Sequence, residues 1–195
     1  MTQKPGAAAH IAAFILIALG IAADQLSKHW VLHNLPGRHA MEIIPGCLSF
    51  AYAENRNMAF GIGRFIPESV KLFLLVALTS VLAAVLIVML CRTRETGMRI
   101  ALILAVSGAL GNIIDRVRLG FVVDFIYWHG GFTWPNFNVA DSFICVGVGL
   151  MMVLMFRRPE EIPAPQGASS EDQAADKGGD AGGEGLSGGA GARPL

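Results

Sequence analysis

Long apolar segments without charge are the feature that most limits how this chain can fold. Leu72 to Cys91 form twenty consecutive positions with no charged side chain. A helix needs about 20 mostly apolar residues to cross a bilayer, because the hydrocarbon core is about 30 Å thick and each residue rises about 1.5 Å. Three more windows qualify or nearly qualify: 7–23, 98–114 and 137–156. The sequence therefore predicts an α-helical integral membrane protein with four transmembrane helices.

The composition agrees with a membrane protein and excludes several classes of partner. Only 15% of the 195 residues are charged, against about 25% in a typical soluble domain. The net charge is zero and no basic stripe is present, so no nucleic-acid partner is expected. The three cysteines and five histidines form no CxxC or Cys/His pattern. We expect neither a metal site nor a cofactor.

The first apolar window has two interpretations. A basic start at Lys4, an apolar run and the small residues Ala22 and Ala23 also fit a cleaved signal peptide. However, the positive start is thin, and the helical pattern continues beyond this point to Trp30. We favour a transmembrane span.

The segments between the spans contain signs of β-structure and of a membrane-surface loop. Residues 48–52 alternate with period two, and the polar stretch 54–57 and the apolar stretch 58–62 follow. This order predicts a short hairpin or small sheet with a turn at 54–57. Residues 125–137 carry two tryptophans and a tyrosine among glycines and a proline, which is typical of a loop at the lipid headgroups.

The arginines indicate an orientation, and the C-terminal composition indicates a second region. Three arginines crowd residues 92–99 and two more close the fourth span at 157–158, although the opposite side also carries five. The compactness of the 92–99 loop favours cytoplasmic termini. Residues 159–195 are rich in glycine and acids and cannot build a core. We expect a membrane-embedded domain at 1–158 and a disordered cytoplasmic tail at 159–195.

Polar residues gather in four short segments near the ends of the spans: 24–28, 55–57, 112–116 and 136–141. Four alternating spans place all four segments on the same face of the membrane. A charge within a span costs at least a few kcal/mol, so those that remain are usually functional or paired. In the third segment Asn112 and Arg116 share a helix face, whereas a structural interpretation has Asp115 simply paired with Arg116 at an interfacial helix end.

Two aspartates with apolar neighbours, Asp124 and Asp141, are the candidate catalytic residues. If they face each other, one pKa should rise while the other stays low. One charged and one protonated carboxyl can cleave an amide through an activated water, without a covalent intermediate. The structural alternative is helix capping, with Asp141 or Asn138 at the start of the fourth span and Asp124 before a short helix. Spacing alone does not decide between them, and a proton-coupled carrier or a non-catalytic scaffold also stays open.

Five motifs together resemble the bacterial lipoprotein signal peptidases, the signal peptidase II family, over about residues 10–157. They are Asp24-Gln-Leu-Ser-Lys28, Asn55-Arg-Asn-Met-Ala-Phe60, Gly108-Ala-Leu-Gly-Asn-Ile-Ile-Asp-Arg116, Val122-Val-Asp-Phe125 and Phe137-Asn-Val-Ala-Asp141. Any one motif alone would be a weak signal. Their order along four spans is specific.

The resemblance implies a four-span aspartic endopeptidase of the bacterial inner membrane, with a small extracytoplasmic β-structure and a catalytic pair of Asp124 and Asp141. The implied substrate is a prolipoprotein cleaved before a cysteine that already carries diacylglycerol. Membrane lipid is the other implied partner, and we expect a monomer with its site at the extracytoplasmic face. The resemblance also implies substrate-binding or supporting roles for five residues: Asn55, Asn112, Arg116, Asn138 and Ala140.

The same resemblance implies that Asp24 and Lys28 are a structural polar pair. The chain departs from the family pattern at Asn57, where glycine is usual, and at Met58, where alanine is common. These departures concern the tip of the expected hairpin and leave the two aspartates in place.

Overall fold

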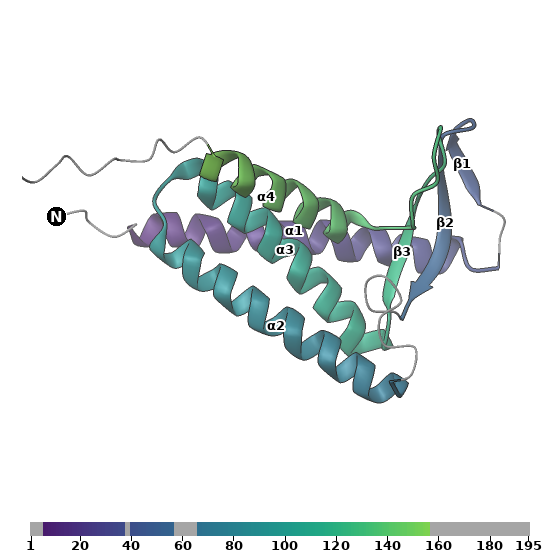
Figure 1. Cartoon of the computed structure of the whole chain (residues 1–195), viewed down its shortest axis with the longest axis horizontal. Helices are drawn as coiled ribbons and strands as arrows, with labels where there is room; N and C mark the ends of the chain where they lie inside the picture. The colour runs from purple at the N-terminus through teal and green to yellow at the C-terminus, as the bar shows by residue number, and fades with distance from the viewer. Residues whose placement is uncertain (1–5, 38–39, 57–65, 157–195) are drawn as a thin grey trace, which may run out of the picture. The chain divides into compact units, whose positions relative to one another are not determined.

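The computed structural model describes residues 6–37, 40–56 and 66–156 (Figure 1). Four helices are long and apolar enough to cross a membrane: α1 (Ala7–Asn34), α2 (Glu68–Arg92), α3 (Thr96–Leu119) and α4 (Val139–Phe156). Three strands form one small sheet: β1 (Met41–Ile44), β2 (Leu48–Asn55) and β3 (Val122–Trp128). The predicted four spans and small sheet are confirmed. The expected tail at 159–195 and the departures at Asn57 and Met58 lie outside the described residues.

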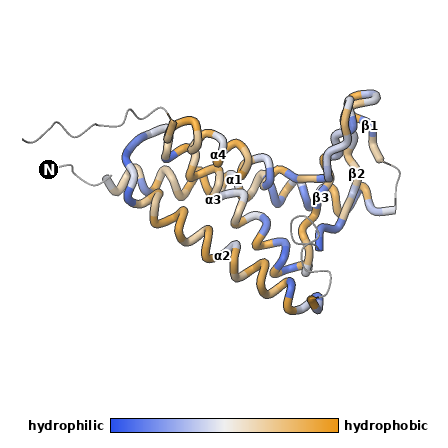
Figure 2. Tube along the Cα trace, in the orientation of Figure 1, coloured by the Kyte–Doolittle hydropathy of each residue, from blue (hydrophilic) through white to orange (hydrophobic). Residues whose placement is uncertain are grey.

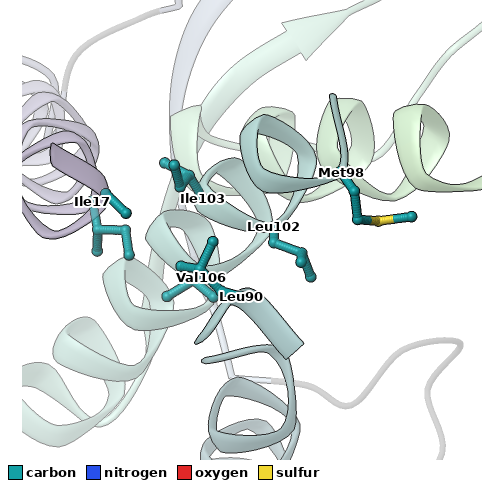
Figure 3. Close-up of a cluster of buried hydrophobic side chains, with 7 residues drawn as sticks. Ile17, Leu90, Met98, Leu102, Ile103 and Val106 are labelled. Carbon is teal, nitrogen blue, oxygen red and sulfur yellow. The ribbon is translucent and has the colours of Figure 1, made fainter. Parts of the chain in front are cut away.

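The third helix is the centre of the bundle. It packs against α1, α2 and α4, and 56% of its spanning window is buried, against 17% or less in the other three helices. Figure 3 shows part of this core, in which Ile17 of α1 and Leu90 of α2 meet side chains of α3. Those α3 side chains are Met98, Leu102, Ile103 and Val106.

Small residues let α4 approach α3 closely. A Cβ atom added to Gly108 of α3 would collide with the carbonyl oxygen of Ala140 in α4, and one added to Gly147 would lie 2.6 Å from the carbonyl oxygen of Ala101. Small residues at such contacts are how transmembrane helices bring their backbones together. The two helix backbones can therefore lie in contact because the glycines place no side chain between them.

The outer faces of the helices remain apolar and exposed. Figure 2 shows hydrophobic residues along most of the four helices and hydrophilic ones mainly at their ends. Large exposed side chains include Phe14, Phe73, Leu78 and Met155. Such surfaces are suited to lipid, because a bilayer solvates them where water would not.

The sheet differs in detail from the sequence prediction. The strand order is β1-β2-β3 and neighbouring strands are antiparallel. The central strand β2 therefore pairs with β1, which precedes it, and with β3, which follows α3 in the chain. The turn predicted at 54–57 is wrong at its start, since Glu54 and Asn55 belong to β2. Residues 125–128, predicted as part of a loop, continue β3. The apolar alternation of β2 was readable, but its partners are distant in sequence.

A glycine turns the chain directly from α3 into β3. Gly120 has φ +82° and its amide donates to the carbonyl of Arg116 at 3.1 Å. The left-handed backbone region is readily open only to glycine, which commonly ends helices in this way. Because β3 begins only two residues later, the last turn of α3 and the strand that carries Asp124 lie side by side.

Candidate active site

Asn138 caps α4, and Asp141 completes the cap. The backbone amide of Asp141 donates to Asn138 Oδ1 at 2.9 Å, and the amide of Asn138 donates back to Asp141 Oδ2 at 3.3 Å. This reciprocal arrangement is a capping box, with an aspartate in the place usually held by Glu or Gln. The helix cap that the sequence left open as an alternative for these residues is present. It fixes the Asp141 carboxylate at the first turn of the helix and leaves that side chain half-buried.

Asp124 does not cap a helix, because it lies in the middle of β3 opposite Ala53 of β2. Its Oδ1 accepts a hydrogen bond from Asn138 Nδ2 at 2.7 Å, and its Oδ2 accepts one from Asn55 Nδ2 at 3.0 Å. Asn55 is two residues beyond Ala53 and therefore on the same face of the sheet. Asp124 is thus held between a strand and the start of α4.

Asn138 contacts both aspartates. Its side-chain amide donates to Asp124, while its backbone amide and side-chain oxygen engage Asp141. One buried residue therefore links the two carboxyl groups. Sequence spacing could not establish this meeting, since Asp124 and Asp141 come from different kinds of element.

Burial is the main influence on the protonation of Asp124. Loss of water around this carboxyl, and then the neighbouring charge of Asp141, raise its pKa to about 6, in spite of the hydrogen bonds from Asn55 and Asn138. Both causes act on the charged form, which is disfavoured away from water and beside a like charge. Near neutral pH this carboxyl can therefore hold or release a proton.

Asn112 of α3 supports Asp141 from the other side. Its Nδ2 donates to Asp141 Oδ1 at 2.8 Å. Its Oδ1 accepts from Lys28 Nζ at 3.0 Å and from Asn138 Nδ2 at 3.3 Å. Two donors on the oxygen fix the orientation of the amide, because a flip would place donor against donor. The nitrogen of Asn112 therefore stays directed at the carboxylate.

Asp24 and Lys28 form an ion pair that is buried inside the protein. Lys28 Nζ lies 2.9 Å from Asp24 Oδ2, and both side chains are 2% exposed or less. Asp24 Oδ1 accepts a hydrogen bond from the backbone amide of Ala140 at 2.9 Å. Ala140 is fully buried, so its contribution is made by its backbone and small size.

Asp115 is a residue whose partner the sequence did not predict. Its Oδ2 lies 2.9 Å from Lys28 Nζ, so the structural interpretation that paired it with Arg116 is wrong for the described contacts. Its Oδ1 accepts from Gln25 Nε2 at 2.9 Å. Spacing along α3 could not reveal this, because Gln25 and Lys28 belong to α1.

Arg116 lies beside the aspartates without bonding to them. Its guanidinium is attracted by the charges of Asp141, Asp124 and Asp115. Its Nε is buried and has no hydrogen-bond partner among the described residues. A buried donor of this kind normally has a partner, since leaving it unsatisfied costs about 1–3 kcal/mol.

Within the described residues, no group of three or more His, Cys, Asp or Glu side chains is arranged to hold a metal ion. The polar groups of the site are carboxylates, amides and two cations. They can orient water and an amide bond and can transfer protons.

Comparisons with known proteins show which family the chain belongs to. The family model described as signal peptidase (SPase) II matches residues 16–157. A protein of Clostridioides difficile named lipoprotein signal peptidase is 42% identical over 142 residues, covering 71% of this chain and 90% of the relative. A lipoprotein signal peptidase of Xanthomonas oryzae is 38% identical over 162 residues, covering 80% of this chain and 95% of the relative.

Solved structures give the same answer for the fold. One described as a bacterial membrane enzyme at 1.9 Å resolution has a TM-score of 0.69 and 26% identity, over 82% of this chain and 99% of its own. A second, at 2.3 Å resolution, has a TM-score of 0.68 and 26% identity. The match of the family model begins within α1 and includes the sheet and the other three helices. The chain therefore belongs to the signal peptidase II family, a family of multi-pass bacterial membrane peptidases.

Proposed function

We propose that Asp124 and Asp141 form the catalytic pair with which this peptidase removes signal peptides from prolipoproteins. The observation that carries the proposal is the way Asn138 links the two carboxyl groups, through its side chain to Asp124 and through its backbone to Asp141. Asn55 and Asn112 hold the remaining oxygen of each carboxyl. Every carboxyl oxygen of the pair is thereby positioned by an amide.

The two aspartates have different proposed roles. Asp124 is buried with a raised pKa, so it is the residue that holds the proton. Asp141 is half-buried and can be reached by water. In this assignment Asp141 acts as the general base and Asp124 as the general acid.

The reaction then proceeds in two steps. Asp141 takes a proton from a water molecule while the water oxygen bonds to the scissile carbonyl carbon, and Asp124 gives its proton to the carbonyl oxygen. The tetrahedral diol collapses when the carbon–nitrogen bond breaks and the amine nitrogen takes the proton held by Asp141. A hydroxyl of the diol returns a proton to Asp124, which restores the starting state.

Arg116 is proposed to bind the substrate backbone. Its unsatisfied Nε points to a partner that a peptide carbonyl oxygen would supply. A cation beside the scissile bond would also stabilise negative charge that develops on the carbonyl oxygen.

The substrate is proposed to carry a diacylglyceryl group on the cysteine after the cleavage site. The apolar outer faces of the helices support this, because a lipid-anchored peptide would reach the site sideways from the bilayer. The enzyme is proposed to act as a monomer, and the peptidase domain is proposed to span residues 1–158.

The site is proposed to face the extracytoplasmic side, with both termini in the cytoplasm. The start of α1, the end of α4 and the arginine-bearing α2–α3 connection share one end of the bundle, and the sheet lies at the other (Figure 1). In a cysteine-free background, Glu42→Cys on β1 should react with an impermeant maleimide in intact spheroplasts, and Arg94→Cys should not. The reverse pattern would overturn the orientation.

The catalytic proposal is tested with Asp124→Asn and Asp141→Asn. Each variant should insert and fold but lose at least about 100-fold in cleavage of a synthetic diacylglyceryl prolipopeptide, since general acid–base groups contribute about 10²–10⁴-fold. Glu42→Gln, an equally conservative change at an exposed carboxylate, should cleave normally. Near-normal cleavage by either folded Asp variant would overturn the pair.

A further inference from the structure

Lys28 joins two buried carboxylates from different helices. Its Nζ lies 2.9 Å from Asp24 Oδ2 in α1 and 2.9 Å from Asp115 Oδ2 in α3. All three side chains are 3% exposed or less. A buried ion cluster is expensive to form and is a weak source of stability, so its presence calls for another explanation.

One of these carboxylates holds the backbone beside Asp141. Asp24 Oδ1 accepts a hydrogen bond from the amide of Ala140 at 2.9 Å. Ala140 directly precedes Asp141 on the first turn of α4. The contact therefore fixes where the proposed general base is placed relative to α1.

The other carboxylate holds the backbone beside Asp124 in the same way. Asp115 Oδ2 accepts a hydrogen bond from the amide of Val123 at 3.1 Å. Val123 directly precedes Asp124 on β3. Each proposed catalytic residue thus follows a residue whose amide is bound by one carboxylate of the cluster, and Lys28 connects the two carboxylates.

Lys28 also acts on a side chain of the site. Its Nζ donates to Asn112 Oδ1 at 3.0 Å, and the Nδ2 of the same amide donates to Asp141. Without the ammonium group, one of the two donors that orient the Asn112 amide would be lost. Three hydrogen-bonded routes therefore run from Lys28 to the pair.

We propose that Lys28 is a positioning residue for the reaction, because it sets the separation of the two aspartate-bearing segments and the orientation of Asn112. The inference rests on the proposed catalytic roles of Asp124 and Asp141. It assigns to the Asp24–Lys28 pair a part in the rate of the chemical step, beyond the structural part implied by the family resemblance. Errors of about 1 Å in the placement of reacting groups can cost about 100-fold in rate.

The charges that face Lys28 determine the pH response of a variant. Lys28 interacts with Asp24 on α1, Asp115 on α3 and Asp124 on β3. Asp141 on α4 and Arg116 on α3 in turn act on these carboxylates through their charges. Removing the ammonium alone takes a positive charge from this group. Removing the ammonium and one carboxylate together leaves the net charge unchanged, which separates an effect of charge from an effect of geometry.

The test compares Lys28→Met with the charge-balanced double variant Lys28→Met/Asp24→Asn, using full-length enzyme and a synthetic diacylglyceryl prolipopeptide. The matched control is Lys71→Met, because Lys71 is also buried and pairs with Glu68 at 2.8 Å, but on α2. The quantities measured are kcat and KM per folded enzyme, the pH profile and the melting temperature.

Both Lys28 variants should lower kcat at least about tenfold with KM changed less than about threefold. Lys28→Met should also move the alkaline limb of the pH profile to higher pH, because a lost positive charge makes ionisation of the aspartates harder. The double variant should return the limb towards wild type while kcat stays low. Lys71→Met should change neither kcat nor the pH profile.

A wild-type kcat and pH profile per folded enzyme in the Lys28 variants would overturn the positioning role. Failure of both Lys28 variants to fold, with normal folding of Lys71→Met, would assign the cluster to folding alone and overturn it too. The two proposals fail separately, since full activity of Asp124→Asn or Asp141→Asn would remove the catalytic pair itself.

Discussion

Asn138 and Asp141 exchange hydrogen bonds in both directions across the first turn of α4, at 2.9 and 3.3 Å. The same contact that starts the helix therefore places the proposed general base. Capping and catalysis, which are alternatives when only the sequence is considered, are combined in one residue pair. The carboxylate of Asp141 thus helps to start α4 and is also the group proposed to activate water.

Replacing Asn138 separates these two roles. Asn138→Ser keeps a good helix cap but loses the amide nitrogen that donates to Asp124, so the start of α4 should be kept while kcat falls at least about tenfold. Asn138→Ala loses the cap as well and should cost about 1 kcal/mol more in unfolding free energy. Thermal unfolding and cleavage kinetics check both variants. Equal activity of Asn138→Ser and wild type would contradict the proposed link between the two carboxyls.

The pH dependence of cleavage should reveal Asp124. The protonated fraction of this carboxyl falls as pH rises through its pKa of about 6, so kcat/KM of the free enzyme should decline on the alkaline side. The apparent value belongs to the pair, because the two carboxyls titrate together. A profile measured with the diacylglyceryl prolipopeptide checks this, and a kcat/KM that rises through this range would contradict the acid role of Asp124.

Asp141→Asn should lower the pKa of Asp124. Burial is the largest cause of the raised value and the charge of Asp141 is the second, so a neutral side chain at 141 removes one of the two. Infrared difference titration of the protonated carboxyl band measures the change, with Glu42→Gln as the control. An unchanged or higher midpoint would show that Asp141 does not act on Asp124 through its charge.

Asp124→Asn should stabilise the protein increasingly as pH rises. The folded state keeps the Asp124 proton up to about pH 6, whereas the unfolded chain releases it near its ordinary value of 3.8. Between these values the folded state binds more protons, so the free energy of unfolding falls with rising pH in wild type. The variant has no titrating group at this position, so its free energy of unfolding does not fall for this reason. Its melting temperature relative to wild type should therefore increase between pH 4 and pH 7, about the window the two pKa values define.

Gly108→Ala should separate α3 from α4. The added Cβ would meet the carbonyl oxygen of Ala140, a backbone atom that cannot yield without moving the start of α4. We expect a loss of about 1–3 kcal/mol in unfolding free energy and a larger proportional loss of activity. Gly149→Ala is the matched control, since nothing lies within 4 Å of its added Cβ. Equal effects at the two glycines would contradict a special approach at Gly108.

The helices were predictable because a bilayer imposes a length and a composition on them. The windows 72–91 and 98–114 lie within α2 and α3. The continuation of the first window to Trp30 was readable too, and α1 extends to Asn34. These features are local, so a single segment contains all the information needed.

The sheet and the buried cluster were only partly predictable, because their contacts are distant in sequence. The strand at 48–52 was found, but its pairing with β3 joins residues such as Ala53 and Asp124, about seventy positions apart. Lys28 and Asp24 were singled out as a pair, yet the contact of Lys28 with Asp115 depends on the packing of α1 against α3. A contact between two different elements does not change the hydrophobic pattern of either segment, so it cannot be predicted from that pattern.

The antiparallel register of β2 and β3 has a consequence for changes in chain length. Successive side chains of a strand face opposite sides, so slipping β3 by one residue would present Val123 or Phe125 where the carboxyl of Asp124 now stands. A slip by two would restore the facing direction but carry Asp124 away from Asn55. Insertions or deletions of either one or two residues between Gly120 and Asp124 should therefore misplace the carboxyl, because β3 supports the site in one register only.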